Sequence, residues 1–141
     1  MCTSCSSKAP RARPRARARS REAGMVTVQL VVLMPALFAL MFAGVQAAMF
    51  YHGRTVAIAA AQEGARAAAA QNGTIGAGEA AASAFVAAAG GDGVLRGVTV
   101  SSSRSATTAT TVVTGSILSV IPGWTPTVTQ SASAPVERIT R

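Results

Sequence analysis

The longest feature of the hydropathy pattern is an apolar stretch from Met25 to Phe50 that contains no charged side chain. As a helix it would reach about 39 Å at about 1.5 Å per residue, which exceeds the roughly 30 Å thickness of a bilayer's hydrocarbon core. The pattern therefore predicts a transmembrane helix. Pro35 removes one backbone hydrogen bond inside this helix, so we expect a kink there.

Alanine, the strongest helix former, dominates residues 51–71. Glu63 and Arg66 stand three residues apart with the acid nearer the N-terminus, a spacing that stabilises a helix. The transmembrane helix is therefore predicted to continue outside the membrane through this extension. Asn72 and Gly73 are expected to end it, because both tolerate the left-handed conformation of helix C-caps.

Small residues gather on one face of this extension, at spacings of 4, 3 and 4 residues. They are Ala57, Ala61, Gly64 and Ala68. A face without bulky side chains lets another helix or a sheet approach closely, although an alanine-rich coding bias would produce the same row. We expect the packing contacts of the helix there and along the transmembrane span itself, including contacts with partner proteins.

A second helical period lies between residues 78 and 89, where apolar residues recur at i, i+3, i+4 and i+7. They are Ala82, Phe85, Val86 and Ala89. The glycine-rich segment from Gly90 to Gly93 ends this predicted helix. A short helical turn is predicted further along, capped by Ser116 and stopped by Pro122.

The pattern alternates in the last third of the chain. Residues 97–101 and 106–114 are rich in valine and threonine and predict a β-hairpin with its turn at residues 103–105. An extended segment that begins at Trp124 would add a third strand, since three strands against a helix can be independently stable. One face of that strand carries Val128, Gln130, Ala132 and Ala134. The predicted fold class is α+β: a long N-terminal transmembrane helix that extends outside the membrane, a second short helix and a small antiparallel sheet.

Most of the net charge of +8 precedes the apolar stretch. The basic residues there, opposed only by Glu22, are Lys8, Arg11, Arg13, Arg15, Arg17, Arg19 and Arg21. Because Lys and Arg beside a span stay on the cytoplasmic side, we expect a single pass through a membrane with the N-terminus in the cytoplasm. The chain is predicted to divide into four segments: a disordered basic leader (residues 1–24), a transmembrane helix (25–50), an alanine-rich extension (51–71) and an exported α+β region (72–141).

Candidate chemistry is sparse. Cys2 and Cys5 have the spacing of half a zinc site, but the chain offers no second ligand pair, so we interpret them as incidental thiols. His52 is interpreted as a residue of the outer membrane interface. No motif of a hydrolase, a phosphate-binding loop or a zinc protease occurs. The sequence therefore predicts neither an enzyme nor a cofactor, and the leader, which lacks aromatic residues and abuts the span, does not predict nucleic-acid binding.

A basic leader, a glycine and then an apolar helix that begins Met25-Val-Thr-Val-Gln29 resemble the precursors of type IV pilin-like proteins. The resemblance implies a prepilin-type peptidase that cuts on the cytoplasmic side, between Gly24 and Met25, and leaves the helix intact.

Residues 24–70 more closely resemble the TadE-like family of minor pseudopilins from tight-adherence (Flp) pilus systems. The matching residues are Gly24, a polar residue at Gln29, Pro35, an aromatic near the outer end (Tyr51), and Glu63, Gly64 and Arg66 in the alanine-rich run. A weaker likeness continues through Ile121-Pro-Gly-Trp124 to Arg138. The resemblance implies a non-catalytic role in assembly of a pilus or a related secretion apparatus. Membrane lipid, other pilins or pseudopilins, and membrane platform proteins would be its partners.

Gln29 departs from the pilin pattern. Pilin-like precursors usually carry glutamate at the fifth position after the cut, where the carboxylate meets the new N-terminal amine of a neighbouring subunit. An amide keeps hydrogen bonding but loses the charge pairing, which inside lipid is worth more than in water. Cleavage is compatible with this substitution, whereas incorporation into a filament is put in doubt.

Two other hypotheses fit the same leader and helix. One is an uncleaved signal anchor that tethers an extracytoplasmic binding module, which predicts a well-formed pocket in residues 72–141. The other is a secretory signal peptide cut after Ala47, at Val45-Gln46-Ala47. The apolar segment is much longer than such a signal requires, so we favour the pseudopilin.

Overall fold

The computed structural model describes the backbone of residues 19–137 and the side chains of residues 28–137. The leader before Arg19, with Cys2 and Cys5, lies outside these residues, and so do the predictions on it. Predictions on the side chains of Gly24 and Met25 also lie outside them. The chain divides into two units, residues 1–40 and residues 41–141. Helix α1 (Arg19–Ala69) begins in the first unit, inside the predicted leader, and ends in the second.

In the first unit α1 exposes every described side chain from Val28 to Leu40. Most of these are large and apolar. The helix continues through Pro35 without an interruption in its assignment, and the kink expected at that residue stays a prediction.

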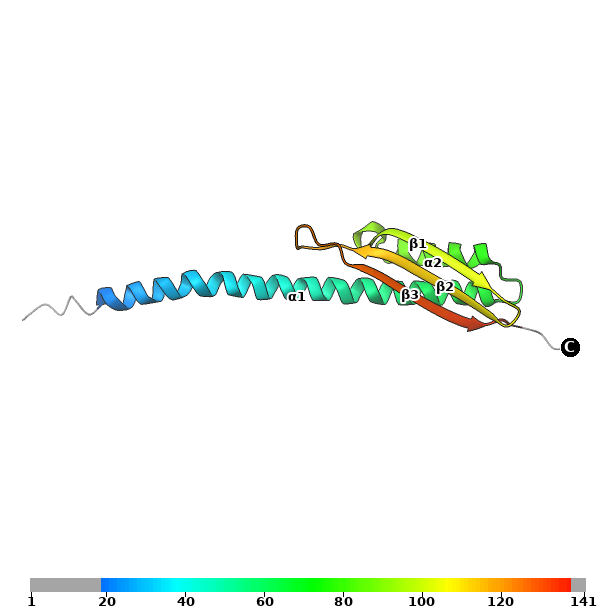
Figure 1. Ribbon diagram of the computed structural model, residues 1–141, viewed down its shortest axis with the longest axis horizontal. Helices are drawn as coiled ribbons and strands as arrows, with labels where there is room; N and C mark the ends of the chain where they lie inside the picture. The colour runs from blue at the N-terminus through cyan, green and yellow to red at the C-terminus, as the bar shows by residue number, and fades with distance from the viewer. Residues whose placement is uncertain (1–18, 138–141) are drawn as a thin grey trace, which may run out of the picture. The chain divides into compact units, whose positions relative to one another are not determined.

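The second unit contains the rest of α1, a second helix α2 (Ile75–Ala88), a short 3-10 helix η1 (Gly91–Gly93) and three strands. The strands are β1 (Leu95–Arg104), β2 (Thr108–Ile117) and β3 (Thr127–Pro135), in the order β1-β2-β3. Both pairs are antiparallel (Figure 1). The predicted α+β class, with a long apolar helix, a second short helix and a three-stranded antiparallel sheet, is confirmed.

Helix α2 begins three residues before the predicted start because Thr74 caps it. The Thr74 hydroxyl accepts a hydrogen bond from the Ala77 N–H at 3.0 Å, which satisfies one of the free donors of the first turn. The apolar period shows only where the buried face begins, at Gly78. The capping turn before it was therefore missed.

The short helical turn predicted after Ser116 is wrong. Ser116 and Ile117 continue β2, where Ser116 pairs with Thr127 of β3. The Ile117 side chain is buried in the core and lies close to Gly53 of α1, where an added Cβ would meet its Cγ1 at 2.9 Å. The contact with α1 and the pairing with β3 together fix an extended conformation that local propensity does not predict.

The two helices and the inner face of the sheet share one hydrophobic core. Helix α1 contributes Val56, Ala57, Ala60 and Ala61; α2 contributes Ala82 and Val86; the strands contribute Leu95, Val113, Ile117 and Val128. Alanines supply most of the helical side of this core. The side chains bring little volume, so the backbones of the helices and the sheet lie close together.

The closest approach of the two helices is at Gly64 of α1 and Gly78 of α2. A Cβ added to Gly64 would lie 2.8 Å from the Gly78 carbonyl oxygen and 2.8 Å from Thr111 Cγ2 of β2. A Cβ added to Gly78 would likewise lie 2.8 Å from the Gly64 carbonyl oxygen and from Ala68 Cβ. The space that any side chain would occupy is already filled, so both positions require glycine.

Polar groups of β1 form hydrogen bonds with the two helices beside it. The Arg104 guanidinium donates to the carbonyls of Ala68 and Ala70, the second at 3.0 Å, at the C-terminal end of α1. A cation there pairs with free carbonyls and with the negative end of the helix dipole. In α2, the Glu79 carboxylate accepts the Ser102 N–H at 3.1 Å.

Replacing Gly64 with alanine is expected to lower the free energy of unfolding by about 1–3 kcal/mol, because a methyl group forced into a filled site moves the backbones apart. Unfolding of the full chain in detergent by urea, followed through the fluorescence of Trp124, measures the change.

Gly76→Ala is the matched control. Gly76 lies on the exposed side of α2, and a Cβ there would meet nothing within 4 Å. Alanine is expected to raise the free energy of unfolding by up to about 1 kcal/mol, since its helix propensity exceeds that of glycine. The same shift for both variants would contradict close packing at Gly64.

Candidate functional site

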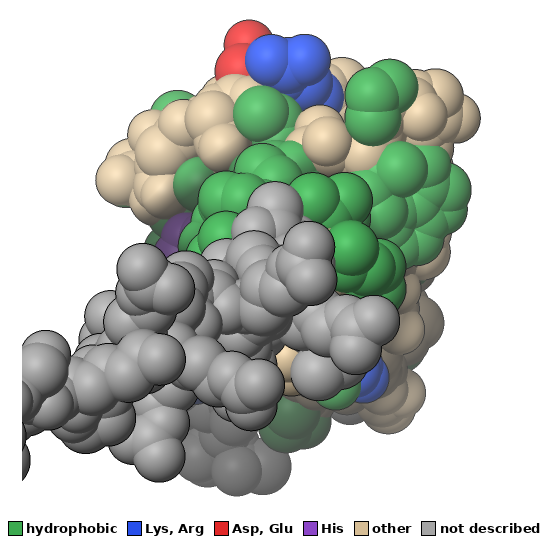
Figure 2. All heavy atoms as spheres, turned by 90° about the vertical axis from the view of Figure 1, so that its left-hand side faces the viewer, with side chains coloured by type: hydrophobic (Ala, Val, Ile, Leu, Met, Phe, Trp, Pro, Cys, Tyr) green, Lys and Arg blue, Asp and Glu red, His purple; other side chains and the backbone are tan. Residues whose placement is uncertain are grey.

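The described part of α1 from Val28 to Ala69 is long and apolar enough to cross a membrane. Its most apolar window of 18 residues has a mean hydropathy of 2.3, and no part of that window is buried. Large apolar side chains left open over such a length mark a surface that binds lipid or protein. Figure 2 shows hydrophobic side chains gathered on the face towards the viewer, with the visible charged side chains at its margin.

Gln46 is a polar side chain buried in this part of α1, and only 4% of its surface is exposed. Its Oε1 accepts the Val120 N–H at 2.8 Å, and the Ser119 hydroxyl lies within donating distance at 3.2 Å. Its Nε2 donates to the Leu118 carbonyl at 3.5 Å, a long hydrogen bond. The amide therefore holds three consecutive residues of the β2–β3 loop, residues 118–126, against α1.

The loop has internal structure of its own. The Trp124 N–H donates to the Ile121 carbonyl at 3.3 Å across Pro122 and Gly123, and Gly123 has a φ of 81°. Proline second and a left-handed glycine third are the requirements of a type II turn. The Ile117 N–H donates to the Pro126 carbonyl at 2.8 Å and closes the base of the loop. Ile121 and Trp124 are thus held at fixed positions.

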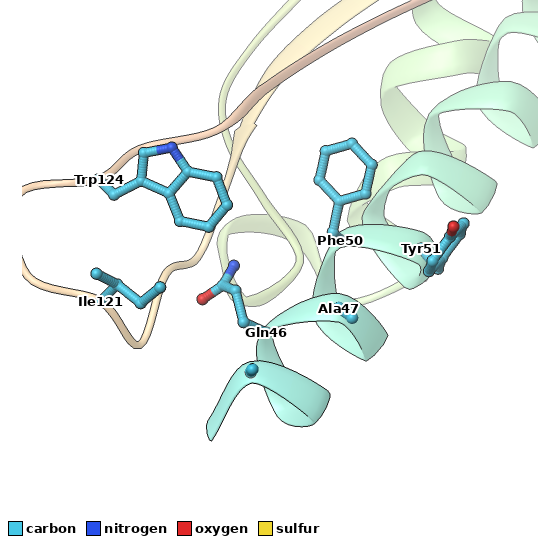
Figure 3. Close-up of a pocket in the computed structure, with 7 residues that line it drawn as sticks. Gln46, Ala47, Phe50, Tyr51, Ile121 and Trp124 are labelled. Carbon is cyan, nitrogen blue, oxygen red and sulfur yellow. The ribbon is translucent and has the colours of Figure 1, made fainter. Parts of the chain in front are cut away.

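A hollow of about 450 Å³ lies between this loop and α1. It is lined by Ala43, Gln46, Ala47, Phe50, Tyr51, Ile121 and Trp124. Figure 3 shows Trp124 and Ile121 on the loop side, and Gln46, Ala47 and Phe50 on the helix side. Because the Gln46 amide already bonds the loop, the lining presents mainly apolar surface. The hollow suits an apolar ligand or an alkyl chain and offers few groups for orienting a polar one.

The predicted small face is buried within this chain. Ala57, Ala61, Gly64 and Ala68 are all buried against α2 and the sheet. In this conformation another subunit does not reach them. The large apolar side chains that α1 exposes lie between Val28 and Val45, with Tyr51 beyond them.

The other predicted site residues are not brought together. Gln29 is exposed in the first unit, Tyr51 is exposed in the second, and Gly24 and Met25 lie within α1. Glu63 Oε2 and Arg66 Nη1 lie 3.6 Å apart, and both side chains are largely exposed. An exposed pair of this kind contributes little to stability, about 0–1 kcal/mol.

Residues that could carry catalysis or bind a metal are dispersed. Within residues 28–137 no group of three His, Cys, Asp or Glu side chains is placed to hold a metal ion. His52 is exposed beside Met49 and Val94, and the Glu79 carboxylate accepts a backbone hydrogen bond. Residue chemistry in this range gives no basis for a catalytic centre.

Sequence reasoning missed the role of Gln46, which it considered only as part of a cleavage site. A signal was available, since an amide inside an apolar helix needs hydrogen-bond partners wherever it is buried. The partners themselves stand 72 to 74 residues away along the chain, so the sequence pattern alone could not name them.

Comparison with protein families assigns residues 24–66 to the family model described as TadE-like protein. The resemblance inferred from the sequence is confirmed over these residues, which cover most of α1 and end before α2. Comparisons with curated proteins and with solved structures found no match. The family match suggests a protein associated with the tight-adherence pilus.

Replacing Gln46 with leucine is expected to release the β2–β3 loop, because the Val120 N–H loses its acceptor at a cost of about 1–3 kcal/mol. Hydrogen exchange of the full chain in detergent measures this release. The amides of residues 118–121 are expected to exchange about tenfold faster or more.

Gln62→Leu is the matched control, since Gln62 lies on the same helix with an exposed side chain. It is expected to leave the protection of residues 118–121 unchanged. Equal protection of the loop in both variants would show that Gln46 does not hold it.

Proposed function

We propose that this protein is a membrane-anchored pseudopilin that supports assembly of a tight-adherence pilus or a related secretion apparatus. It acts by helix packing and not by catalysis. The observation that carries the proposal is the coincidence of the TadE-like match, residues 24–66, with an exposed apolar helix long enough to span a bilayer. Neither feature alone would suffice, since the family match suggests a pilus system but no location, whereas the apolar helix suggests a membrane but no pilus system.

In this proposal α1 crosses the bacterial cytoplasmic membrane with the leader inside. The basic residues before the span favour that orientation, because they stay on the cytoplasmic side. The part of the chain after the span, with the sheet and α2, then lies outside the membrane. The large exposed apolar side chains of α1 between residues 28 and 45 face lipid, other pilins or pseudopilins, and membrane platform proteins.

A prepilin-type peptidase would cut between Gly24 and Met25, inside the first turns of α1, and leave the helix from Met25 onwards as the new N-terminus. A cut after Ala47 is less compatible with the fold, because it would remove Gln46 and with it the acceptor of the Val120 N–H. Gln29 is exposed on α1 and lacks the carboxylate that pairs with a neighbour's amine. We therefore place the protein at the assembly site and not in the repeating filament.

The hollow between α1 and the β2–β3 loop gives the alternative, a membrane-tethered binding module, some support. Its volume of about 450 Å³ is within the range of small-molecule sites. However, it is formed largely by α1, not by residues 72–141 alone as that hypothesis predicts. An uncleaved leader would be the second requirement of the alternative.

The mass of the protein extracted from membranes tests the proposal. We expect the loss of residues 1–24, and retention of the leader in a Gly24→Leu variant, because leucine cannot replace the glycine before the cut. Gly44→Leu is the control, since Gly44 lies in the same helix with open space around its Cα, and it should be processed normally. A chain that lacks residues 1–47 would be secreted and would overturn the membrane anchor; an intact wild-type chain would favour the binding module.

A further inference from the structure

The β2–β3 loop presents large apolar side chains to solvent beside the apolar part of α1. Val120, Ile121 and Trp124 are 40%, 46% and 48% exposed. Tyr51 of α1 lines the same hollow as Ile121 and Trp124 and is exposed as well. Burial inside the protein therefore does not account for these four side chains, which together we name the loop patch.

The position of the loop along α1 is fixed by Gln46, whose amide bonds residues 118–120. Before Gln46, the apolar residues 25–45 would reach about 32 Å as a helix, close to the roughly 30 Å of a hydrocarbon core. After it come the apolar residues 47–50 and then Tyr51, His52 and Arg54, the last three all exposed. In a membrane-spanning α1 the loop would thus lie at the depth where acyl chains give way to headgroups.

We propose that the loop patch inserts into the outer leaflet and seats the exported unit on the membrane surface, with phospholipid as the occupant of the apolar hollow. This inference rests on the proposed membrane anchor. Tryptophan and tyrosine favour this depth, because each has an apolar ring and a polar group that remains in contact with water or headgroups. The loop patch supplies one of each.

Charge at the loop agrees with lipid as the occupant. Among the described residues that line the 450 Å³ hollow and a second hollow of about 230 Å³ in the loop itself, Arg96 carries the only charge. An exposed cation beside an apolar patch matches the phosphate groups of phospholipids. The Gln46 amide, which could otherwise specify a polar partner, is already bonded to the loop.

The loop is also rigid enough to hold the exported unit. Its two ends are tied by the Ile117 to Pro126 hydrogen bond, its centre by Gln46, and its tip by the turn at Pro122 and Gly123. A preorganised loop loses little conformational entropy on insertion, so more of the transfer free energy of its side chains goes into binding. Insertion at this second place would fix the tilt of the sheet relative to the membrane.

Trp124 is the only tryptophan of the chain and reports directly on this contact. We would reconstitute the full chain into vesicles of phosphatidylcholine and phosphatidylglycerol that carry bromine at shallow acyl carbons. The bromines are expected to quench most of the Trp124 emission, and aqueous iodide little of it. Because both leaflets are brominated and iodide is present inside and outside the vesicles, the orientation of reconstitution does not affect the result.

The control combines Trp124→Phe with Thr107→Trp. Thr107 is exposed in the β1–β2 turn, at the opposite end of β2 from the loop. The tryptophan placed there should be quenched by iodide and not by bromine. Bromine quenching of Trp124 no stronger than in this control would overturn the insertion of the loop. So would shielding of Trp124 from both quenchers, which would indicate a second copy of the chain over the patch.

Flotation of the same vesicles separates the two proposals. If the chain floats with the lipid and Trp124 is not quenched, the loop insertion fails and the membrane anchor stands. If the chain does not float, the anchor itself fails and the loop insertion with it. Flotation together with bromine quenching of Trp124 supports both.

Discussion

Close contact between α1, α2 and the sheet depends on two positions that have no side chain, Gly64 and Gly78. A core made largely of alanine buries little apolar surface per residue, and each buried methylene is worth only about 0.8 kcal/mol. Such a core gains stability from many dispersion contacts, which require backbones to lie at short distance. Thr111, fully buried beneath this crossing, bonds the Ser102 hydroxyl at 2.8 Å and so brings no unsatisfied polar group into it.

Elements with a clear period could be predicted from the sequence. The apolar stretch, the face that contains Ala57 and Ala61, the buried side of α2 and the alternation of Val128 with its neighbours all follow from the geometry of a helix or a strand. A helical wheel shows which face is small but not what covers it. The structure fills that face with α2 and the sheet of the same chain.

Contacts between distant residues could not be predicted. Ile117 and its neighbours fit a helical turn as well as a strand, and the pairing with β3 and burial beside Gly53 decide between them. Arg104 bonds carbonyls at the end of α1 that lie 34 and 36 residues earlier. In each case a local pattern is compatible with several partners, and only the folded chain selects one.

Gln46 marks the point where α1 changes its surroundings. Immediately before it Met41, Phe42 and Val45 are exposed and large, and from Gly53 onwards the inward face is buried and small. A membrane helix needs large apolar side chains towards lipid, whereas a helix under a sheet needs small ones, so one helix that serves both must change composition along its length. The amide at this boundary holds the loop that we propose to insert into lipid. The same hydrogen bonds that complete the fold would therefore set the depth at which the exported unit meets the membrane.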